Sequence, residues 1–126
     1  MIKEAYVSFN VAKLLKEKGF DEPTWTCYIE HKISHYDYTS SNSELIDGVI
    51  SAPTLQMAMK WLREKHNICI IIYPDIENGY EAVLYDIENN VKIVLQSFGV
   101  YGIHIYEKIY EEAVEAALKY VLEKLI

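Results

Sequence analysis

Two histidines of the chain are spaced so that they could share one face of a strand. His31 and His35 lie close to Glu30 and Asp37, and imidazole and carboxylate groups are the ligands that transition metals use in proteins. Four such residues on one hairpin do not approach the closed spacing of structural zinc motifs. We therefore predict a solvated hairpin and no metal site at this position.

Three carboxylates have part of the spacing of a calcium loop. Asp75, Glu77 and Asp86 fall at its first, third and twelfth positions. However, Gly79 occupies a ligand position, the twelfth residue is Asp in place of a bidentate Glu, and strand-like runs flank the segment where helices would be needed. The segment is more typical of turns between strands than of a calcium site.

Motifs of catalysis and of cofactor binding are absent from the sequence. There is no G-x-S-x-G elbow, H-E-x-x-H motif, phosphate-binding glycine loop or dinucleotide fingerprint. His66 and His104 have no evident partner, and Glu111 and Glu112 stand at a helix start, where the helix dipole favours negative charge. We predict no catalytic residue, no cofactor and no metal, hence no enzyme. A small enzyme whose site assembles only in three dimensions stays open, and a pocket holding a histidine beside a carboxylate would favour it.

Tyrosine is the one residue type in excess. Tyr28, Tyr36 and Tyr38 join Trp25 on one predicted hairpin, and the chain has 11 tyrosines. A wide apolar ring with a polar tip and little side-chain entropy suits a binding surface. Aromatic residues are also enriched in strands, where they pair across a sheet. Both interpretations stay open, and we name Tyr28, Tyr36 and Tyr38 as candidates for protein binding, on the hairpin face that bears Tyr28.

The elements that position these residues follow from local patterns. Residues 8–19 predict a helix, capped by Ser8 and closed by Gly19 in a left-handed turn. Between residues 24 and 30, Trp25, Cys27 and Ile29 alternate with polar positions, which indicates a half-buried strand that returns through residues 33–38. Residues 39–51 lack a clear period and read as a connecting loop.

The second half of the chain alternates between strands and helices in the same way. Pro53 suits the first turn of a helix that runs to about residue 65. In residues 67–73, apolar side chains occupy the positions that would face either side of a strand. This pattern favours a central strand covered on both faces. Residues 80–87 and 91–98 predict a hairpin, residues 99–106 are ambiguous, and a helix follows from residue 109. The expected class is α+β, an antiparallel sheet of about five strands with helices on one face, in the order α-β-β-α-β-β-β-α.

Composition and charge limit the classes of function. A chain of 126 residues with 51% hydrophobic and 25% charged residues predicts one folded domain, residues 1–126. Cys27 and Cys69 read as reduced, buried thiols. Without an apolar leader or a run long enough to span a bilayer, we expect a cytoplasmic protein with no membrane association.

The net charge of −7 is concentrated in one half of the chain. Residues 67–126 hold four Lys/Arg against ten Asp/Glu, whereas residues 1–66 hold eight against nine. Because acidic surfaces repel phosphate backbones, nucleic-acid binding is disfavoured. The alternative is a nucleic-acid-binding module that uses the basic residues of the N-terminal half, namely Lys13, Lys16, Lys18, Lys60, Arg63 and Lys65.

Three segments, residues 13–23, 51–66 and 110–126, resemble a family of small uncharacterised proteins encoded by phages and mobile elements of gut bacteria. The resemblance implies a phage or mobile-element origin and brings no activity, cofactor or site residue with it. Our leading hypothesis is a non-catalytic accessory protein that binds another protein. The oligomeric state is left open, with a homodimer as one option.

Overall fold

The computed structural model describes residues 1–92, 96–97, 100–101 and 105–126. In chain order the elements are α1 (Phe9–Glu17), β1 (Thr24–Ile29), β2 (Lys32–Ser40), β3 (Val49–Ser51), α2 (Leu55–His66), β4 (Ile68–Asp75), β5 (Gly79–Asp86), β6 (Val91–Lys92), β7 (Gln96–Ser97), β8 (Val100–Tyr101), β9 (Ile105–Glu107), α3 (Tyr110–Tyr120) and a π-helical extension of α3, η1 (Val121–Leu125).

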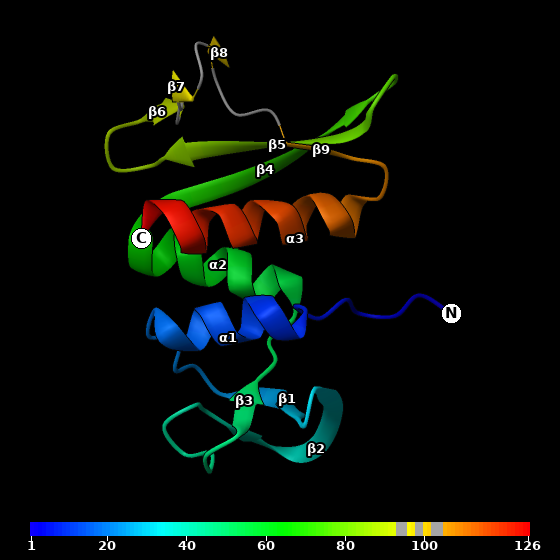
Figure 1. The fold of residues 1–126 in the computed structure, drawn as a ribbon, viewed down its shortest axis with the longest axis vertical. Helices are drawn as coiled ribbons and strands as arrows, with labels where there is room; N and C mark the ends of the chain where they lie inside the picture. Colours follow the sequence, from blue (N-terminus) through cyan, green and yellow to red (C-terminus); the bar gives the residue numbers. More distant parts are fainter. Residues whose placement is uncertain (93–95, 98–99, 102–104) are drawn as a thin grey trace.

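The helices lie between two antiparallel sheets (Figure 1). One sheet, which we call the small sheet, has the strand order β2-β1-β3. The other, which we call the large sheet, has the order β4-β5-β6, with β9 also paired to β5. The short strands β7 and β8 pair with each other. The predicted α+β class is confirmed, and the strands are divided between two sheets where one was expected. Residues 49–51, expected as loop, form β3, which pairs with β1 as the third strand of the small sheet.

The predicted caps set the ends of α1, whereas α2 starts later than predicted, because Pro53 lies before its N-cap, Thr54, and outside the first turn. Ser8 Oγ accepts a hydrogen bond from the amide of Val11 at 3.2 Å, and Gly19 takes the left-handed conformation with φ of 93°. Thr54 caps α2 by accepting from the amide of Met57 at 3.1 Å, and Asn67 ends it with φ of 56°. Both α1 and α2 therefore begin with a hydroxyl cap and end at a left-handed residue, as these residue types favour.

The core forms where the three helices meet the inner faces of the sheets. Its buried members include Leu15 of α1, Leu62 of α2 and Leu118 of α3, together with Ile70 and Leu84 of the large sheet. Tyr28 and Ile50 of the small sheet pack against the same cluster. One continuous cluster thus connects the small sheet, the helices and the large sheet.

The predicted central position of the strand over residues 67–73 is wrong. In the described part of the chain β4 pairs with β5 alone, and β5 pairs with β4, β6 and β9. The sequence could not show this, because an apolar run has the same pattern whether its second neighbour is a strand of the same chain or something else. β4 is therefore an edge strand with the sequence of a central one.

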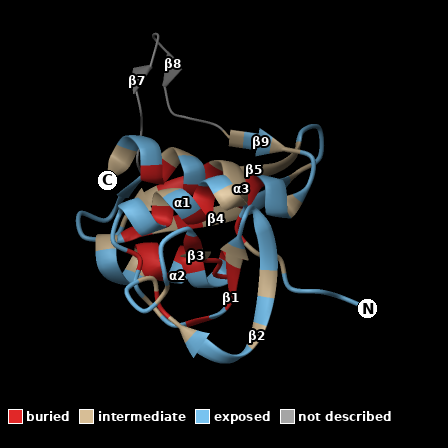
Figure 2. Cartoon of the chain, turned by 60° about the horizontal axis from the view of Figure 1, so that its bottom comes forward, coloured by how far each residue is buried: buried red, intermediate tan, exposed pale blue. Residues whose placement is uncertain are grey.

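The face of β1 that points into the core bears Thr24 and Thr26, whereas the alternation of Trp25, Cys27 and Ile29 predicts the other face. Thr24 and Thr26 are buried, whereas Trp25 and Ile29 are exposed. The neighbouring strand β2 is mostly exposed (Figure 2). The buried hydroxyls are satisfied, because Thr26 Oγ1 donates to the carbonyl of Ala52 and Thr24 Oγ1 donates to the carbonyl of Thr26. One of these hydrogen bonds lies within β1 and the other reaches Ala52, the residue after β3. Local alternation reveals neither of them, and they allow the threonines to point inward.

The remaining segments are confirmed in part. β5 and β6 pair as the predicted hairpin, with Asp86 opposite Val91. Within the ambiguous residues 99–106, β8 and the start of β9 are strands. Parts of both predictions fall on residues 93–95, 98–99 and 102–104, which lie outside the described residues.

Candidate functional site

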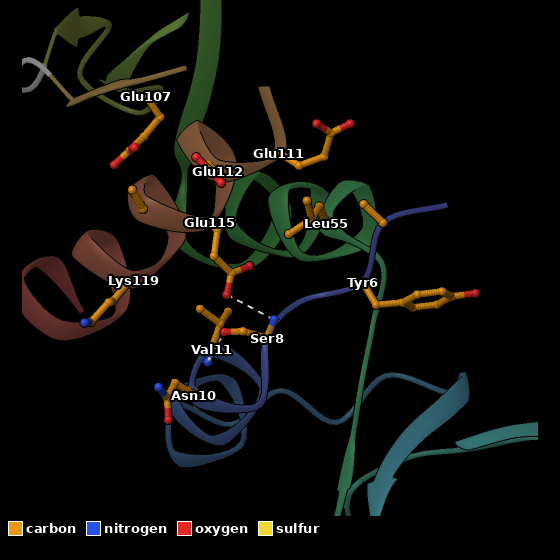
Figure 3. A pocket seen from close by; sticks show the side chains of 12 residues that line it. Tyr6, Ser8, Asn10, Val11, Leu55, Glu107, Glu111, Glu112, Glu115 and Lys119 are labelled. Atoms are coloured by element: carbon orange, nitrogen blue, oxygen red, sulfur yellow. Dashed lines mark hydrogen bonds between the residues drawn. The ribbon is translucent and has the colours of Figure 1, made fainter. Parts of the chain in front are cut away.

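A groove with a volume of about 510 Å³ lies between the start of α1 and one face of α3. We call it the acidic groove, because four glutamates contribute to its lining. Its lining residues are Ala5, Tyr6, Ser8, Asn10, Val11, Leu55, Glu107, Glu111, Glu112, Glu115, Ala116 and Lys119 (Figure 3).

One wall of the groove is the N-terminal segment that leads into α1. Residues 5–7 run antiparallel to residues 53–55, since the amide of Val7 donates to the carbonyl of Pro53 at 3.0 Å and the amide of Leu55 donates to the carbonyl of Ala5 at 2.9 Å. These backbone bonds hold the segment against the start of α2. The wall is therefore fixed by pairing with residues nearly fifty positions away.

The opposite wall is a single face of α3. Glu115 follows Glu111 by four residues and Glu112 by three, and Lys119 follows Glu115 by four, which places these side chains along one side of the helix. Figure 3 shows Glu112, Glu115 and Lys119 on this wall, across from Ser8 and Asn10. The helical period therefore gathers the carboxylates at the groove.

One of these carboxylates also holds the two walls together. Glu115 Oε1 accepts a hydrogen bond from the amide of Ser8 at 3.0 Å. Ser8 is the N-cap of α1, and the positive end of a helix dipole favours a carboxylate there. Glu115 is thus a structural residue of the groove, whereas Glu111 and Glu112 are exposed to solvent.

The chemistry of the groove combines an apolar floor with an acidic rim. Val11 and Leu55 are buried at its base, and the carboxylates and Lys119 stand at its edge. Within the described residues, no three His, Cys, Asp or Glu side chains are grouped closely enough to hold a metal ion. The described lining contains no histidine, so it offers no imidazole for acid–base chemistry.

The three candidate tyrosines do not share a surface. Tyr28 faces the core, donates its hydroxyl to the carbonyl of Val7 at 2.6 Å and contacts the ring of Phe9 edge-on. Burial, and secondarily the negative charge of Glu115, raise the pKa of Tyr28. Tyr36 and Tyr38 stack on each other with ring centroids 5.2 Å apart. The structure thus brings two of the three together and separates Tyr28 from them.

Tyr36 and Tyr38 lie on the outer face of the small sheet. A hydrogen bond with the thiol of Cys27 raises the pKa of Tyr36, and Cys27 points away from the core because successive strand residues alternate between faces. Tyr38 is 58% exposed, and Trp25, which is 59% exposed, lines a separate hollow with Tyr6 and Met57. We call Tyr36 and Tyr38 the outer aromatic face.

The residues considered for metal sites have packing and turn roles. His31 stacks on Phe9 at 3.9 Å between ring centroids, and His35 contacts Tyr6 edge-on at 5.5 Å. Asp75 Oδ1 accepts hydrogen bonds from the amides of Glu77 and Asn78 at 3.0 and 2.8 Å. Asp86 accepts from Asn89, which lowers the pKa of Asp86. Asp75 and Asp86 therefore accept hydrogen bonds within the two predicted turns, which follow β4 and β5.

The basic residues of the N-terminal half are interspersed with acids. Lys60 Nζ lies 4.0 Å from Glu64 Oε1. A hollow beside α2 is lined by Lys60 and Lys65 together with Glu22 and Glu64. Lys18 Nζ donates to the terminal carbonyl of Ile126 at 2.8 Å. This mixture weakens the continuous positive surface that nucleic-acid binding through this half would use.

Comparison of the chain with protein-family models, with curated proteins and with solved structures found no match. In the part of the chain that the structure describes, no helix has the length and apolar character needed to cross a bilayer.

Sequence reasoning missed the acidic groove as a site. The local signal was the pair of Glu111 and Glu112, which we interpret from the sequence as helix-start charge. The opposite wall, which includes Ser8 and Asn10, lies about a hundred residues earlier in the chain. No pattern within either segment indicates that the two meet, because their approach depends on packing of α1 against α3.

Proposed function

We propose that this protein is a non-catalytic accessory protein that binds another protein, and that the acidic groove receives a basic segment of the partner. The observation that carries the proposal is the groove itself, a hollow of about 510 Å³ with buried Val11 and Leu55 in its lining and glutamates at its rim. The groove is shallow and open to solvent, which suits a segment of a partner protein that lies along the surface.

A lysine or arginine side chain matches both parts of this lining. Its apolar stem can lie along the partly exposed Ala5 and Ala116 of the lining, while its charged end stays near the rim carboxylates in contact with water. A single exposed ion pair contributes only about 0–1 kcal/mol. Several carboxylates acting together raise the rate of encounter with a positive partner and disfavour negative ones.

Three further parts of the proposal follow the sequence hypotheses. The protein acts without catalysis, for which the support is the missing catalytic motifs and the absence of histidine from the described groove lining. It works in the cytoplasm, and it derives from a phage or mobile element, as the family resemblance implies. A small enzyme remains the alternative, and turnover of a substrate by the purified protein would support it.

The outer aromatic face is a second candidate surface for protein binding. Tyr38 is more than half exposed, at 58%, and its ring stacks on that of Tyr36 with centroids 5.2 Å apart. Exposed aromatic residues of this kind form the energetic centre of many interfaces. It differs from the acidic groove in its expected response to salt, because an apolar interface is not weakened by screening.

The test is capture of partners from lysate of the native host by the tagged protein, followed by identification of retained proteins and nucleic acids. A groove variant, Glu111→Gln with Glu112→Gln, is compared with a matched control, Glu77→Gln with Glu88→Gln, which removes the same charge from exposed turns. We expect one stoichiometric protein partner that is retained by the control and reduced at least tenfold in the groove variant. Circular dichroism checks that both variants fold.

Other outcomes reassign or reject the proposal. Loss of the partner only in Tyr36→Ser with Tyr38→Ser moves the interface to the outer aromatic face. Retention of nucleic acid that falls steeply with salt supports the nucleic-acid alternative. A partner held equally by all variants rejects both surfaces.

A further inference from the structure

β4 presents an unpaired edge in the described part of the chain. Its pairing with β5 begins beside the hydrogen bond from the amide of Ile87 to the carbonyl of Asn67, at 2.8 Å. In an antiparallel ladder, every second residue directs both backbone groups at the same partner. Residues 67, 69, 71 and 73 therefore bond to β5, and Ile68, Ile70 and Ile72 direct their N–H and C=O groups away from β5, to the side where no described strand pairs. Ile68 and Ile70 are themselves 7% and 3% exposed and belong to the core.

Most of this edge lacks the features that usually prevent strands from pairing with other chains. Residues 68–73 contain no charged residue and no proline, which occur only at the end of β4 in Pro74 and Asp75, and the β4–β5 ladder is regular from Ile68 to Asp75. One of the two edge strands of the small sheet, β2, differs in its charges and in its irregular pairing. It carries Lys32 and Asp37, and its register shifts opposite Thr24 and Thr26. Charges and irregularities of this kind block edge pairing.

We propose that β4 pairs antiparallel with β4 of a second copy of this chain, so that the two large sheets join across a twofold axis at Ile70. Ile70 then exchanges both backbone hydrogen bonds with Ile70 of the partner, and Ile68 does so with the partner's Ile72. Pro74 has no N–H group, so a register shifted toward it loses a bond. The register centred on Ile70 uses every outward-directed group of Ile68, Ile70 and Ile72.

A second copy fits this edge better than an unrelated strand for two reasons. The outward donors and acceptors are symmetric about Ile70, so the edge is complementary to itself, as an isologous interface must be. The absence of charge on residues 68–73 also avoids direct repulsion between two copies of a chain with net charge −7. Pairing would make β4 a central strand, which is the environment that its sequence favours.

The outer face of β4 provides a register-specific test. In the proposed ladder Cys69 lies opposite the partner's Ile71 in a non-hydrogen-bonded pair, where Cα atoms are about 4.5 Å apart. That distance lies within the range of about 4.4–6.8 Å that a disulfide spans. Neither residue is fully buried. Ile71→Cys should therefore form two symmetric disulfides to Cys69 of the partner on mild oxidation.

The control variants separate this register from random oxidation. Tyr73→Cys places a thiol on the same face of the same strand, without Cys69 of the partner opposite it, and Cys69→Ser in the Ile71→Cys background removes the acceptor thiol. We expect covalent dimer from Ile71→Cys at least tenfold above both controls in non-reducing gels, and a concentration-dependent dimer of the unmodified protein in sedimentation. Circular dichroism confirms folding.

The proposal is overturned if Ile71→Cys does not exceed the controls, whatever the sedimentation result. A dimer without this cross-link would mean a different interface. The test does not depend on the proposed function, because β4 contributes no residue to the acidic groove. Partner capture can thus fail while the cross-link forms, and the reverse also holds.

Discussion

At the scale of single residues, Tyr28 shows how a residue type that suits binding can be used within the fold. Its hydroxyl donates to the carbonyl of Val7 and its ring contacts Phe9. It therefore ties β1 to the N-terminal wall of the acidic groove. A tyrosine count cannot distinguish this role from the exposed role of Tyr38, because the difference lies in a partner more than twenty positions away along the chain.

Removing that hydroxyl should weaken the fold and leave the exposed face intact. We expect Tyr28→Phe to lower the free energy of unfolding by about 1 kcal/mol, since the carbonyl of Val7 loses its hydrogen bond in a half-buried position. Tyr38→Phe, at a mostly exposed site, should change it by less than about 0.5 kcal/mol. Urea denaturation measures both. Equal effects of the two substitutions would contradict the structural role of Tyr28.

Two carboxylates fasten the loop between β2 and β3 and make it sensitive to acid. Asp21 Oδ1 accepts from the amide of Ser43 at 2.6 Å, and Glu44 Oε1 accepts from the amide of Ser41 at 3.0 Å. These backbone hydrogen bonds are the main cause that lowers the pKa of each group below its ordinary value of 3.8 or 4.5. The folded loop thus favours the ionised carboxylates.

The sign of the pH dependence follows from these lowered values. The contribution is fully present above the ordinary pKa values and is lost as the pH falls through the lower pKa values of the folded protein. We expect the amide resonances of Ser41 and Ser43 to move together with the titration of Glu44 and Asp21, below pH 4.5 and pH 3.8 respectively. Asp21→Asn should remove the titration at Ser43 and leave that at Ser41. Titration of Ser43 that survives this substitution would count against the assignment.

At the scale of elements, local signals predicted the helices better than the strand partners. Ser8, Gly19 and Asn67 lie within one turn of the helix ends that they define, so the sequence alone predicts where these helices begin or end. The neighbours of β1 and β4 depend on residues elsewhere in the chain. For this reason β3, the second sheet and the edge position of β4 were not predicted.

The turn between β4 and β5 depends on a glycine for two separate reasons. Gly79 has φ of +94°, and a Cβ atom built there would lie 2.6 Å from the backbone oxygen of Glu107 in β9. Gly48 has a similar φ of +86° with nothing within 4 Å of its Cβ position. The two glycines therefore share the conformational requirement, and only Gly79 also has a steric one.

Alanine substitution should separate these two costs. Gly48→Ala is expected to lower stability by about 1–2 kcal/mol through the left-handed conformation alone. Gly79→Ala should cost at least about 1 kcal/mol more, because β9 must move away from β5 to relieve the overlap. Chemical denaturation of both variants gives the comparison, and a smaller loss for Gly79→Ala would show that β9 does not approach as closely.

At the scale of the whole molecule, both sheets share the helical layer. Tyr28 and Ile50 of the small sheet, and Ile70 and Leu84 of the large one, belong to or pack against one cluster that includes Leu62 of α2. Neither sheet has a separate core in this arrangement. The acidic groove reflects the same dependence, since its walls come from opposite ends of the chain and meet only when α1 packs near α3.

A shared core predicts that the two sheets lose their protection together. Leu62→Ala removes a fully buried side chain of α2 and should lower global stability by about 2–5 kcal/mol. Native-state hydrogen exchange then reports the opening free energy of each element. We expect the opening free energies of the most protected amides of β1 and of β5 to decrease by the same amount, because both strands open only when the helical layer opens. If the opening free energies decrease for the β5 amides and stay unchanged for the β1 amides, the small sheet unfolds as an independent unit. The N-terminal wall of the acidic groove would then be held by a separate folding unit.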